Sequence, residues 1–130
     1  MNNETAIKNR IANWAKAIIK RDWDGFLAWH HADFVMYDVV PPFQSVGLDA
    51  YRQTFVIFLE TLQPGDHSFQ VVDLQITAGD DVAFAFSPMK CRYFDKKEQR
   101  IIDLDFRLTI GLKKIDGEWW FIHEHHSVTA

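Results

Sequence analysis

Apolar residues recur at intervals of three and four positions near the start of the chain, which is the spacing of one face of an α-helix. The pattern predicts an amphipathic helix from Thr5 to about Lys20. Its apolar positions are Ile7, Ile11, Trp14, Ala15, Ile18 and Ile19. Asp22 or Asp24 can cap a second, shorter helix, which we expect to end near residues 32–33. That helix carries Phe26, Leu27 and His30.

A short strand and a third helix are predicted next. The run Phe34–Val40 is rich in aliphatic and aromatic residues, and Pro41-Pro42 closes it because proline cannot continue a central ladder. Asp49 heads a third helical pattern, which Pro64-Gly65 stops. The apolar side of this helix comprises Tyr51, Phe55, Phe58, Leu59 and Leu62.

The second half of the chain consists of four segments rich in β-branched or aromatic residues. Clusters of Gly, Asp and Lys separate them, which predicts antiparallel hairpins. The predicted strands are Phe69–Thr77, Val82–Tyr93, Arg100–Lys114 and Trp119–Val128. Pro88 within the second of them predicts a sheet edge or a bulge at that position.

This order of elements predicts a single α+β domain over residues 1–130, in which three N-terminal helices pack on a strongly curved, mostly antiparallel sheet. Such a sheet gives the domain the shape of a cone that is open at one end. In the strand 100–114, alternate positions are apolar on one face, and the last strands carry large apolar groups on the convex face too. We therefore expect a homodimer.

Composition narrows the classes of partner. The formal net charge is −4 and the basic residues occur only as separated pairs, which argues against binding nucleic acid. No uncharged run approaches the roughly 20 residues needed to cross a membrane, and no export signal is evident. The single cysteine, Cys91, excludes an intramolecular disulfide and fits a reducing compartment. We expect a cytoplasmic protein without membrane contact.

The last predicted strand concentrates titratable side chains in the run His123-Glu124-His125-His126. Because side chains alternate along a strand, one face is predicted to hold Trp119, Phe121, His123, His125 and Ser127, and the other Trp120, Ile122, Glu124 and His126. His123 and His125 are either hydrogen-bonded core residues or catalytic groups. Their spacing also suits two zinc ligands, but no third ligand is evident, so we predict no metal site.

Three pieces of sequence carry a family resemblance: Arg107-Leu108-Thr109, Asp116-Gly117-Glu118-Trp119 and His123–Ser127. With the order of elements, they make nearly the whole chain resemble the nuclear-transport-factor-like, or cystatin-like, α+β superfamily, in its SnoaL-like and ketosteroid isomerase-like branch. The association domain of calcium/calmodulin-dependent protein kinase ends similarly, with a glycine-tryptophan hairpin followed by His-x-His-x-Ser. That domain is an oligomerising module and not an enzyme.

The resemblance to ketosteroid isomerase implies a catalytic base at Asp38, on the short strand after the second helix. The tyrosine that binds the oxyanion in that enzyme aligns with Trp14. The acid that assists this tyrosine has no equivalent in the chain, and the position that falls closest to it is Leu104. Alternation puts Asp38 on the face of Phe34 and Met36, where desolvation would raise its pKa and suit it to act as a base. Otherwise Asp38 is an exposed residue that caps the turn.

Arg107 is the second candidate for a catalytic group. A three-residue loop at 115–117 would bring it opposite His125, whereas a two-residue turn would place the two on opposite faces. The resemblance favours the three-residue loop, in which Arg107, Thr109, His123 and His125 form a polar wall for a carboxylate or enolate oxygen. Otherwise Arg107 pairs with Glu98 or Asp105. The candidate ligand contacts, which also suit core packing, are Trp14, Trp29, Tyr37, Phe55, Phe58 and Phe121.

Two functions follow from these residues. The first is a small-molecule-binding domain with acid-base isomerase, cyclase or dehydratase-like chemistry in an apolar pocket, with Asp38 as base and His123, His125 and Arg107 as acids or oxyanion-stabilising groups. Its ligand would be a small apolar or aromatic molecule with an oxygen function, and no cofactor is required. The alternative is a non-catalytic module for oligomerisation or ligand sensing, like the kinase association domain.

Overall fold

The computed structural model describes residues 2–60 and 68–129 of the chain. Helices α1 (Asn3–Lys20) and α2 (Trp23–Leu27) precede β1 (His30–Tyr37) and β2 (Gln44–Val46), and α3 (Leu48–Glu60) follows. The second half contains only strands: β3 (Ser68–Val71), β4 (Gln75–Ala78), β5 (Val82–Asp95), β6 (Arg100–Ile115) and β7 (Glu118–Ser127). The predicted stop of the third helix at Pro64-Gly65 lies outside the described residues.

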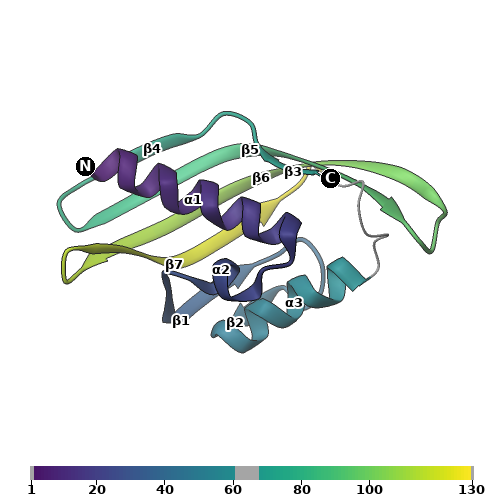
Figure 1. The fold of residues 1–130 in the computed structure, drawn as a ribbon, viewed down its shortest axis with the longest axis horizontal. Helices are drawn as coiled ribbons and strands as arrows, with labels where there is room; N and C mark the ends of the chain where they lie inside the picture. The colour runs from purple at the N-terminus through teal and green to yellow at the C-terminus, as the bar shows by residue number, and fades with distance from the viewer. Residues whose placement is uncertain (1, 61–67, 130) are drawn as a thin grey trace.

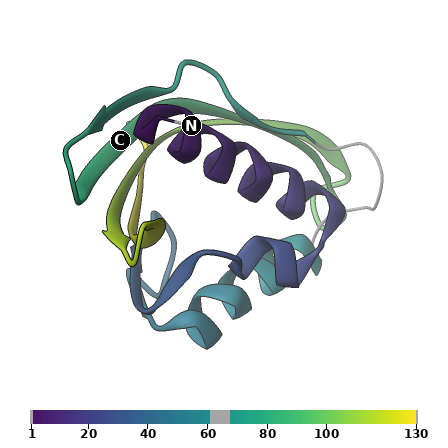
Figure 2. The ribbon, with the colours of Figure 1, turned by 60° about the vertical axis from the view of Figure 1, so that its left-hand side comes forward.

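Within the described residues the strands form one sheet in the order β2-β1-β7-β6-β5-β3, and β4 also pairs with β5 (Figure 1). All neighbours are antiparallel except β1 and β7, which run parallel. The sheet curves over α1, and α2 and α3 lie below (Figure 2). The predicted fold class, helices packed on a strongly curved and mostly antiparallel sheet, is confirmed.

Helix α1 packs on the concave face of the sheet through the apolar stripe that its sequence predicts. Ile7, Ile11, Trp14 and Ile18 are buried. The side chain of Asn2 caps the start of the helix by accepting the backbone N–H of Thr5 at 2.8 Å. No helix in the described ranges is long and apolar enough to span a membrane.

The second helix is shorter than predicted, because the chain turns into a strand earlier. It ends at Leu27, and Trp29 has a positive φ of 62°. The backbone already leaves the helical path at Ala28, whose ψ is 137°, and Trp29 then turns the chain so that β1 begins at His30. His30 is therefore a buried strand residue, and the prediction that it belongs to the helix is wrong.

The predicted strand at 69–77 is two short strands, β3 and β4, which both pair with the same side of β5. Pro88 in β5 lies between the two pairings, where proline's missing N–H interrupts no ladder hydrogen bond. The backbone N–H of Val72 instead donates to the carbonyl of Pro88, and that of Asp73 donates to Ser87 Oγ. Pro88 thus marks a break in the partner strand and not an edge of the sheet.

The hairpin between β6 and β7 turns over two residues. Ile115 pairs with Glu118, and the two residues between them, Asp116 and Gly117, both have positive φ, as a type I′ turn requires. The predicted three-residue loop is wrong. Further along, the register shifts where Gly111 opposes His123 and Leu112 opposes Phe121, so that Ile122 is an extra residue in β7. This is a β-bulge.

Candidate functional site

A cavity of about 520 Å³ lies between α3, the loop after β1 and the concave face of the sheet. Its wall is largely apolar. Residues that line it include Phe55 and Phe58 of α3, Phe69 of β3, Cys91 of β5, and Leu104 and Phe106 of β6. The charged and titratable side chains at this wall include Asp38 and His126.

Asp38 continues the inward-facing series of Phe34 and Met36 just past the end of β1. His126 reaches the same place from β7, and its Nδ1 lies 3.2 Å from Asp38 Oδ1. The same carboxylate oxygen accepts the backbone N–H of Val39 at 2.7 Å. The side chains of Asp38 and His126 are only 11% and 7% exposed, so this ion pair is shielded from water where it borders the cavity.

Behind His126 stands a third ionisable group that the cavity does not touch. The Nε2 atom of His126 lies 2.5 Å from Oε2 of Glu124, whose side chain is 2% exposed. Neither of these two atoms has another partner among the described residues, and the contact is an ion pair without ideal hydrogen-bond angles. Asp38, His126 and Glu124 thus form one charge cluster.

The cluster is tied to two helices through Glu124 Oε1. The hydroxyl of Tyr51 in α3 donates to this atom at 2.6 Å. The indole Nε1 of Trp14 in α1 donates in turn to the oxygen of Tyr51 at 2.8 Å. A continuous polar chain therefore runs from α1 through α3 and β7 to the wall of the cavity.

The charges set the protonation states. Burial alone lowers the pKa of His126, but the negative charge of Glu124 and the contact with Asp38 raise it to about 9. Burial raises the pKa of Asp38, and the hydrogen bond and charge of His126 more than offset this, so that the pKa of Asp38 lies below its ordinary value. At neutral pH the cavity therefore meets a carboxylate backed by an imidazolium.

The expectation that desolvation leaves Asp38 with a raised pKa is wrong, because sequence alone did not place an imidazolium beside it.

The pKa values of two further groups are shifted by burial close to the charge of Glu124. Burial, and then the charge of Glu124, raise the pKa of Tyr51 well above its ordinary value. Burial lowers the pKa of His30, which lies among aromatic rings near Glu124.

His123 and His125 do not face the cavity. The bulge at Ile122 reverses the alternation of β7, so that the inward series is Trp119, Phe121, Glu124 and His126. His123 instead lies beside Tyr37, and its Nδ1 is 2.7 Å from the carbonyl oxygen of Val35. His125 is exposed on the outer face, also against Tyr37. The predicted faces of the last strand are wrong beyond Phe121.

Arg107 also lies on the outer face. Arg107 of β6 lies opposite Ser127 of β7, and the Nε atom of Arg107 donates to Ser127 Oγ at 2.9 Å. Thr109 pairs with His125 on the same exposed side. Arg107 and His125 share a face, as the polar-wall hypothesis requires, but that face points away from the cavity. Among the described contacts, Arg107 forms no ion pair with Glu98 or Asp105. Glu98 instead accepts a hydrogen bond from Arg100.

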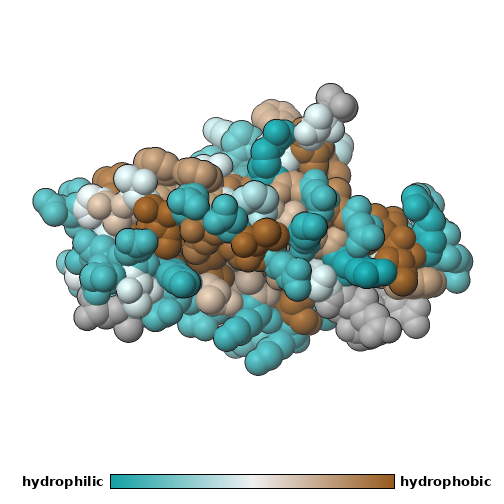
Figure 3. All heavy atoms as spheres, turned by 90° about the horizontal axis from the view of Figure 1, so that it is seen from above, coloured by the Kyte–Doolittle hydropathy of each residue, from teal (hydrophilic) through white to brown (hydrophobic). Residues whose placement is uncertain are grey.

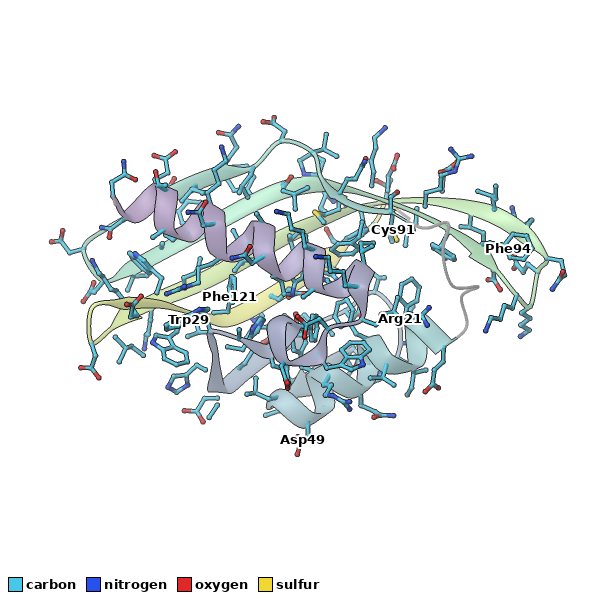
Figure 4. The ribbon with its side chains drawn as sticks, in the orientation of Figure 1. Arg21, Trp29, Asp49, Cys91, Phe94 and Phe121 are labelled. Atoms are coloured by element: carbon cyan, nitrogen blue, oxygen red, sulfur yellow. The ribbon has the colours of Figure 1, made fainter. Side chains whose placement is uncertain are left out.

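Of the six predicted ligand contacts, two line the cavity and four do not. Phe55 and Phe58 line the cavity. Trp14 is buried in the polar chain, and Phe121 packs in the core against His30. Trp29 stacks under the guanidinium of Arg10, and Tyr37 is exposed on the outer face. Figure 4 shows Trp29 and Phe121 in the left half of the molecule and Cys91, which lines the cavity, in the right half.

Sequence reasoning missed Glu124 and His126 as site residues, although one signal pointed to them. A glycine inside a strand often marks a bulge, and Gly111 stands in the middle of β6. It opposes His123 at the shift in register, where an added Cβ would lie 3.6 Å from His123 Cβ. With a bulge assumed there, the alternation would have placed Glu124 and His126 inside.

Within residues 2–60 and 68–129, no group of three or more His, Cys, Asp or Glu side chains is arranged to hold a metal ion. The three members of the charge cluster lie in a row with the imidazole in the middle. Each carboxylate contacts a different ring nitrogen of His126, and this arrangement is suited to holding a proton.

Comparison with known proteins agrees with the fold. The model of the SnoaL-like domain family matches residues 7–130. An NTF2-like protein of unknown function from Pseudomonas putida superposes with a TM-score of 0.84 at 27% identity, covering 99% of this chain and 89% of that one. No curated protein matches the chain.

Two solved structures with lower identity share the fold. A ketosteroid isomerase-like protein from Erwinia carotovora atroseptica has a TM-score of 0.81 at 19% identity, with 100% and 99% of the two chains covered. A candidate scytalone dehydratase from Novosphingobium aromaticivorans has a TM-score of 0.83 at 19% identity, with 98% and 84% covered.

Proposed function

Because the chain belongs to the SnoaL-like domain family, we propose that it binds an uncharged, largely apolar small molecule and transfers a proton of that molecule through the carboxylate of Asp38. The observation that carries this proposal is the position of Asp38, which borders an apolar cavity and is held ionised by His126. A fixed carboxylate in a water-poor site is a suitable group for acid-base catalysis.

The charge of the site supports a ligand without negative charge. Asp38 and Glu124 carry two negative charges against the one positive charge of His126, and no Lys or Arg is among the described residues that line the cavity. An anionic ligand would lose its hydration and meet a cluster of net negative charge, because the cation of His126 is already paired with two carboxylates. A neutral aromatic or alicyclic molecule with an oxygen function fits better. The cavity volume falls in the range of about 300–1,000 Å³ typical of small-molecule sites.

The chemistry needs only groups that the chain supplies. The Asp38 carboxylate takes a proton from a carbon next to a carbonyl group, and the electrons of the broken C–H bond form an enolate. The resulting carboxylic acid then returns the proton to another carbon, which isomerises the ligand, or to a departing hydroxyl group, which dehydrates it. Gln44 and Gln53 are among the residues that line the cavity, and their side chains carry amide N–H groups that can donate to the enolate oxygen.

Asp38→Asn tests the proposal, because it removes the base with little change in shape. We expect a panel of phenolic and enone compounds to bind wild type and variant alike. We expect exchange of the acidic C–H of the bound compound with D₂O, followed by NMR, to slow by about 10²–10⁴-fold in the variant. Asp33→Asn is the matched control, since this β1 aspartate has a side chain 94% exposed. Exchange at the wild-type rate in Asp38→Asn would refute the role of Asp38.

A second candidate function is a non-catalytic module for oligomerisation or ligand sensing. It is favoured by the outer face of the sheet, where Phe84 and Phe86 stack at 6.2 Å and remain about half exposed. The two candidates differ in what the cavity does. A module of this kind would show no proton exchange in any bound compound, and its self-association would depend on the outer face alone.

A further inference from the structure

We infer that Glu124 is a positioning residue, which keeps the imidazole of His126 doubly protonated and so holds Asp38 as an ionised carboxylate at the cavity. Glu124 is not part of the cavity wall and cannot touch a ligand there. The effect of Glu124 on catalysis rests on the proposed function. The effect of Glu124 on the protonation of His126 does not rest on it and has its own measurement.

In the polar chain behind the cavity, the indole of Trp14 determines which group donates and which accepts in each hydrogen bond. The indole N–H of Trp14 can only donate, so the oxygen of Tyr51 accepts from it at 2.8 Å. The hydroxyl hydrogen of Tyr51 is then directed to Glu124 Oε1, 2.6 Å away. One oxygen of Glu124 is thereby occupied as an acceptor. The other oxygen, Oε2, faces only His126.

The two ring nitrogens of His126 face two different carboxylates. Nδ1 lies 3.2 Å from Asp38 Oδ1, and Nε2 lies 2.5 Å from Glu124 Oε2. A neutral imidazole has one N–H and one lone pair. Either tautomer would therefore leave an unprotonated ring nitrogen next to a carboxylate oxygen in a site where the three side chains are at most 11% exposed. Protonation of both nitrogens removes the repulsion between these two atoms, and this requires both carboxylates.

The groups around His126 come from several elements. Asp38 follows β1, Glu124 shares β7, and Tyr51 reaches the cluster from α3. His30 of β1 lies near Glu124 and is disfavoured as a cation by burial, which lowers its pKa. Cys91 of β5 borders the cavity, and burial raises its pKa to about 11. None of these groups other than the two carboxylates supplies negative charge to His126 at neutral pH.

Replacement of Glu124 by glutamine removes the buried charge and retains the shape. The glutamine oxygen can still accept from Tyr51, and its amide N–H can donate to Nε2 of a neutral His126. The imidazole would then keep a proton on Nδ1 alone, directed at Asp38. Asp38 would lose its cationic partner, and the pair would carry the single negative charge of the carboxylate.

The experiment follows the ring nitrogens and carbons of His126 by NMR as a function of pH, in protein without ligand. In wild type the pKa of His126 is about 9, so the ring should stay doubly protonated at pH 7.5. In Glu124→Gln we expect its titration to fall by two pH units or more, to about 7 or below. Glu118→Gln is the matched control, because Glu118 lies on the same strand and pairs with Arg10 at the surface.

The same variants separate positioning from ligand contact in kinetics. With any compound that wild type converts, the pH dependence of kcat in Glu124→Gln should differ from that of wild type between the two titrations of His126, because in this range only wild type retains the imidazolium beside the Asp38 carboxylate. KM should stay within about twofold, since Glu124 does not contact the ligand. Glu118→Gln should leave both parameters unchanged.

Each result decides a different claim. If His126 in Glu124→Gln titrates within half a pH unit of wild type, the role of Glu124 is overturned whatever the activity. If His126 shifts as expected and no compound is converted by wild type, the positioning role stands and the proposed function fails. If Glu124→Gln does not fold, the wild-type ring decides: a single protonated nitrogen at pH 7.5 overturns the inference, and two support it.

Discussion

At the scale of single residues, the positive charge of His126 offsets part of the negative charge of the two carboxylates beside the cavity. A buried imidazolium is costly on its own, and its residue is only 8% exposed. Two carboxylates, one at each ring nitrogen, offset this cost. The result is a group whose proton is bound more tightly in the folded chain than in the unfolded one, which links the site to stability.

Stability should therefore depend on pH in a defined window. The pKa of His126 rises from 6.5 when unfolded to about 9 when folded. Its contribution is fully present below pH 6.5 and is lost as the pH rises through about 9. The shift corresponds to about 3 kcal/mol. Urea unfolding at pH 6 and pH 9.5 should show a loss of that order.

The control for this prediction is His126→Asn, which removes the titrating group. Its unfolding free energy should fall much less than that of wild type between the two pH values, since groups such as the buried Cys91 thiol leave only a smaller dependence. His125→Asn, altered at the exposed neighbour, should behave like wild type. An equal loss in wild type and His126→Asn would mean that another group causes the pH dependence.

At the scale of elements, the polar chain joins two helices to the sheet. Trp14 belongs to α1, Tyr51 to α3 and Glu124 to β7, so the hydroxyl of Tyr51 is the point where three elements meet. The bulge in β7 makes this possible, because it turns Glu124 toward the helices. Without the extra residue at Ile122, Glu124 would point to the outer face.

Tyr51→Phe should destabilise the fold by about 1–3 kcal/mol, because it leaves the indole N–H of Trp14 and an oxygen of Glu124 buried without this partner. Urea unfolding measures the loss. Tyr37→Phe is the control, since Tyr37 lies exposed on the outer face, and it should change stability by less than about 0.5 kcal/mol. Equal effects of the two variants would contradict the role of the chain in joining the elements.

At the scale of the whole molecule, the two faces of the sheet differ in what covers them. The helices cover the concave face (Figure 2). The cavity lies between this face and α3. On the outer face Phe84 and Phe86 remain exposed. Figure 3 shows a band of hydrophobic residues among hydrophilic ones on the side of the molecule where β4 and β5 lie. We propose that a second copy of the chain packs on the outer face.

The double variant Phe84→Ser, Phe86→Ser should shift the chain from dimer to monomer in sedimentation velocity, with its circular dichroism unchanged. Ile57→Ser is the control, because Ile57 is similarly exposed but lies on α3. A wild-type chain that sediments as a monomer at 100 μM, or a double variant that remains dimeric, would exclude this face as the dimer interface.

Local pattern was sufficient for most elements. The spacing of Ile7, Ile11 and Trp14 predicts α1, and the Asp116-Gly117 pair marks the last hairpin. The same local logic failed at His30, because the backbone leaves the helical path at Ala28 and then turns at Trp29, which has a positive φ. It failed again at Ile122, where the extra residue is visible only against the opposing strand.

The sequence by itself determined the three helices, the long strands and the inward direction of Asp38, because each depends on periodicity within one segment. Their order, with the family resemblance, was sufficient to predict the α+β fold, but not β2 or the break between β3 and β4. Only the tertiary structure decided that Glu124 and His126 face the cavity side, while His123, His125 and Arg107 face outward. The reason is that the face of a bulged strand depends on its register with a neighbour, and a pKa depends on charges that meet only in the folded chain.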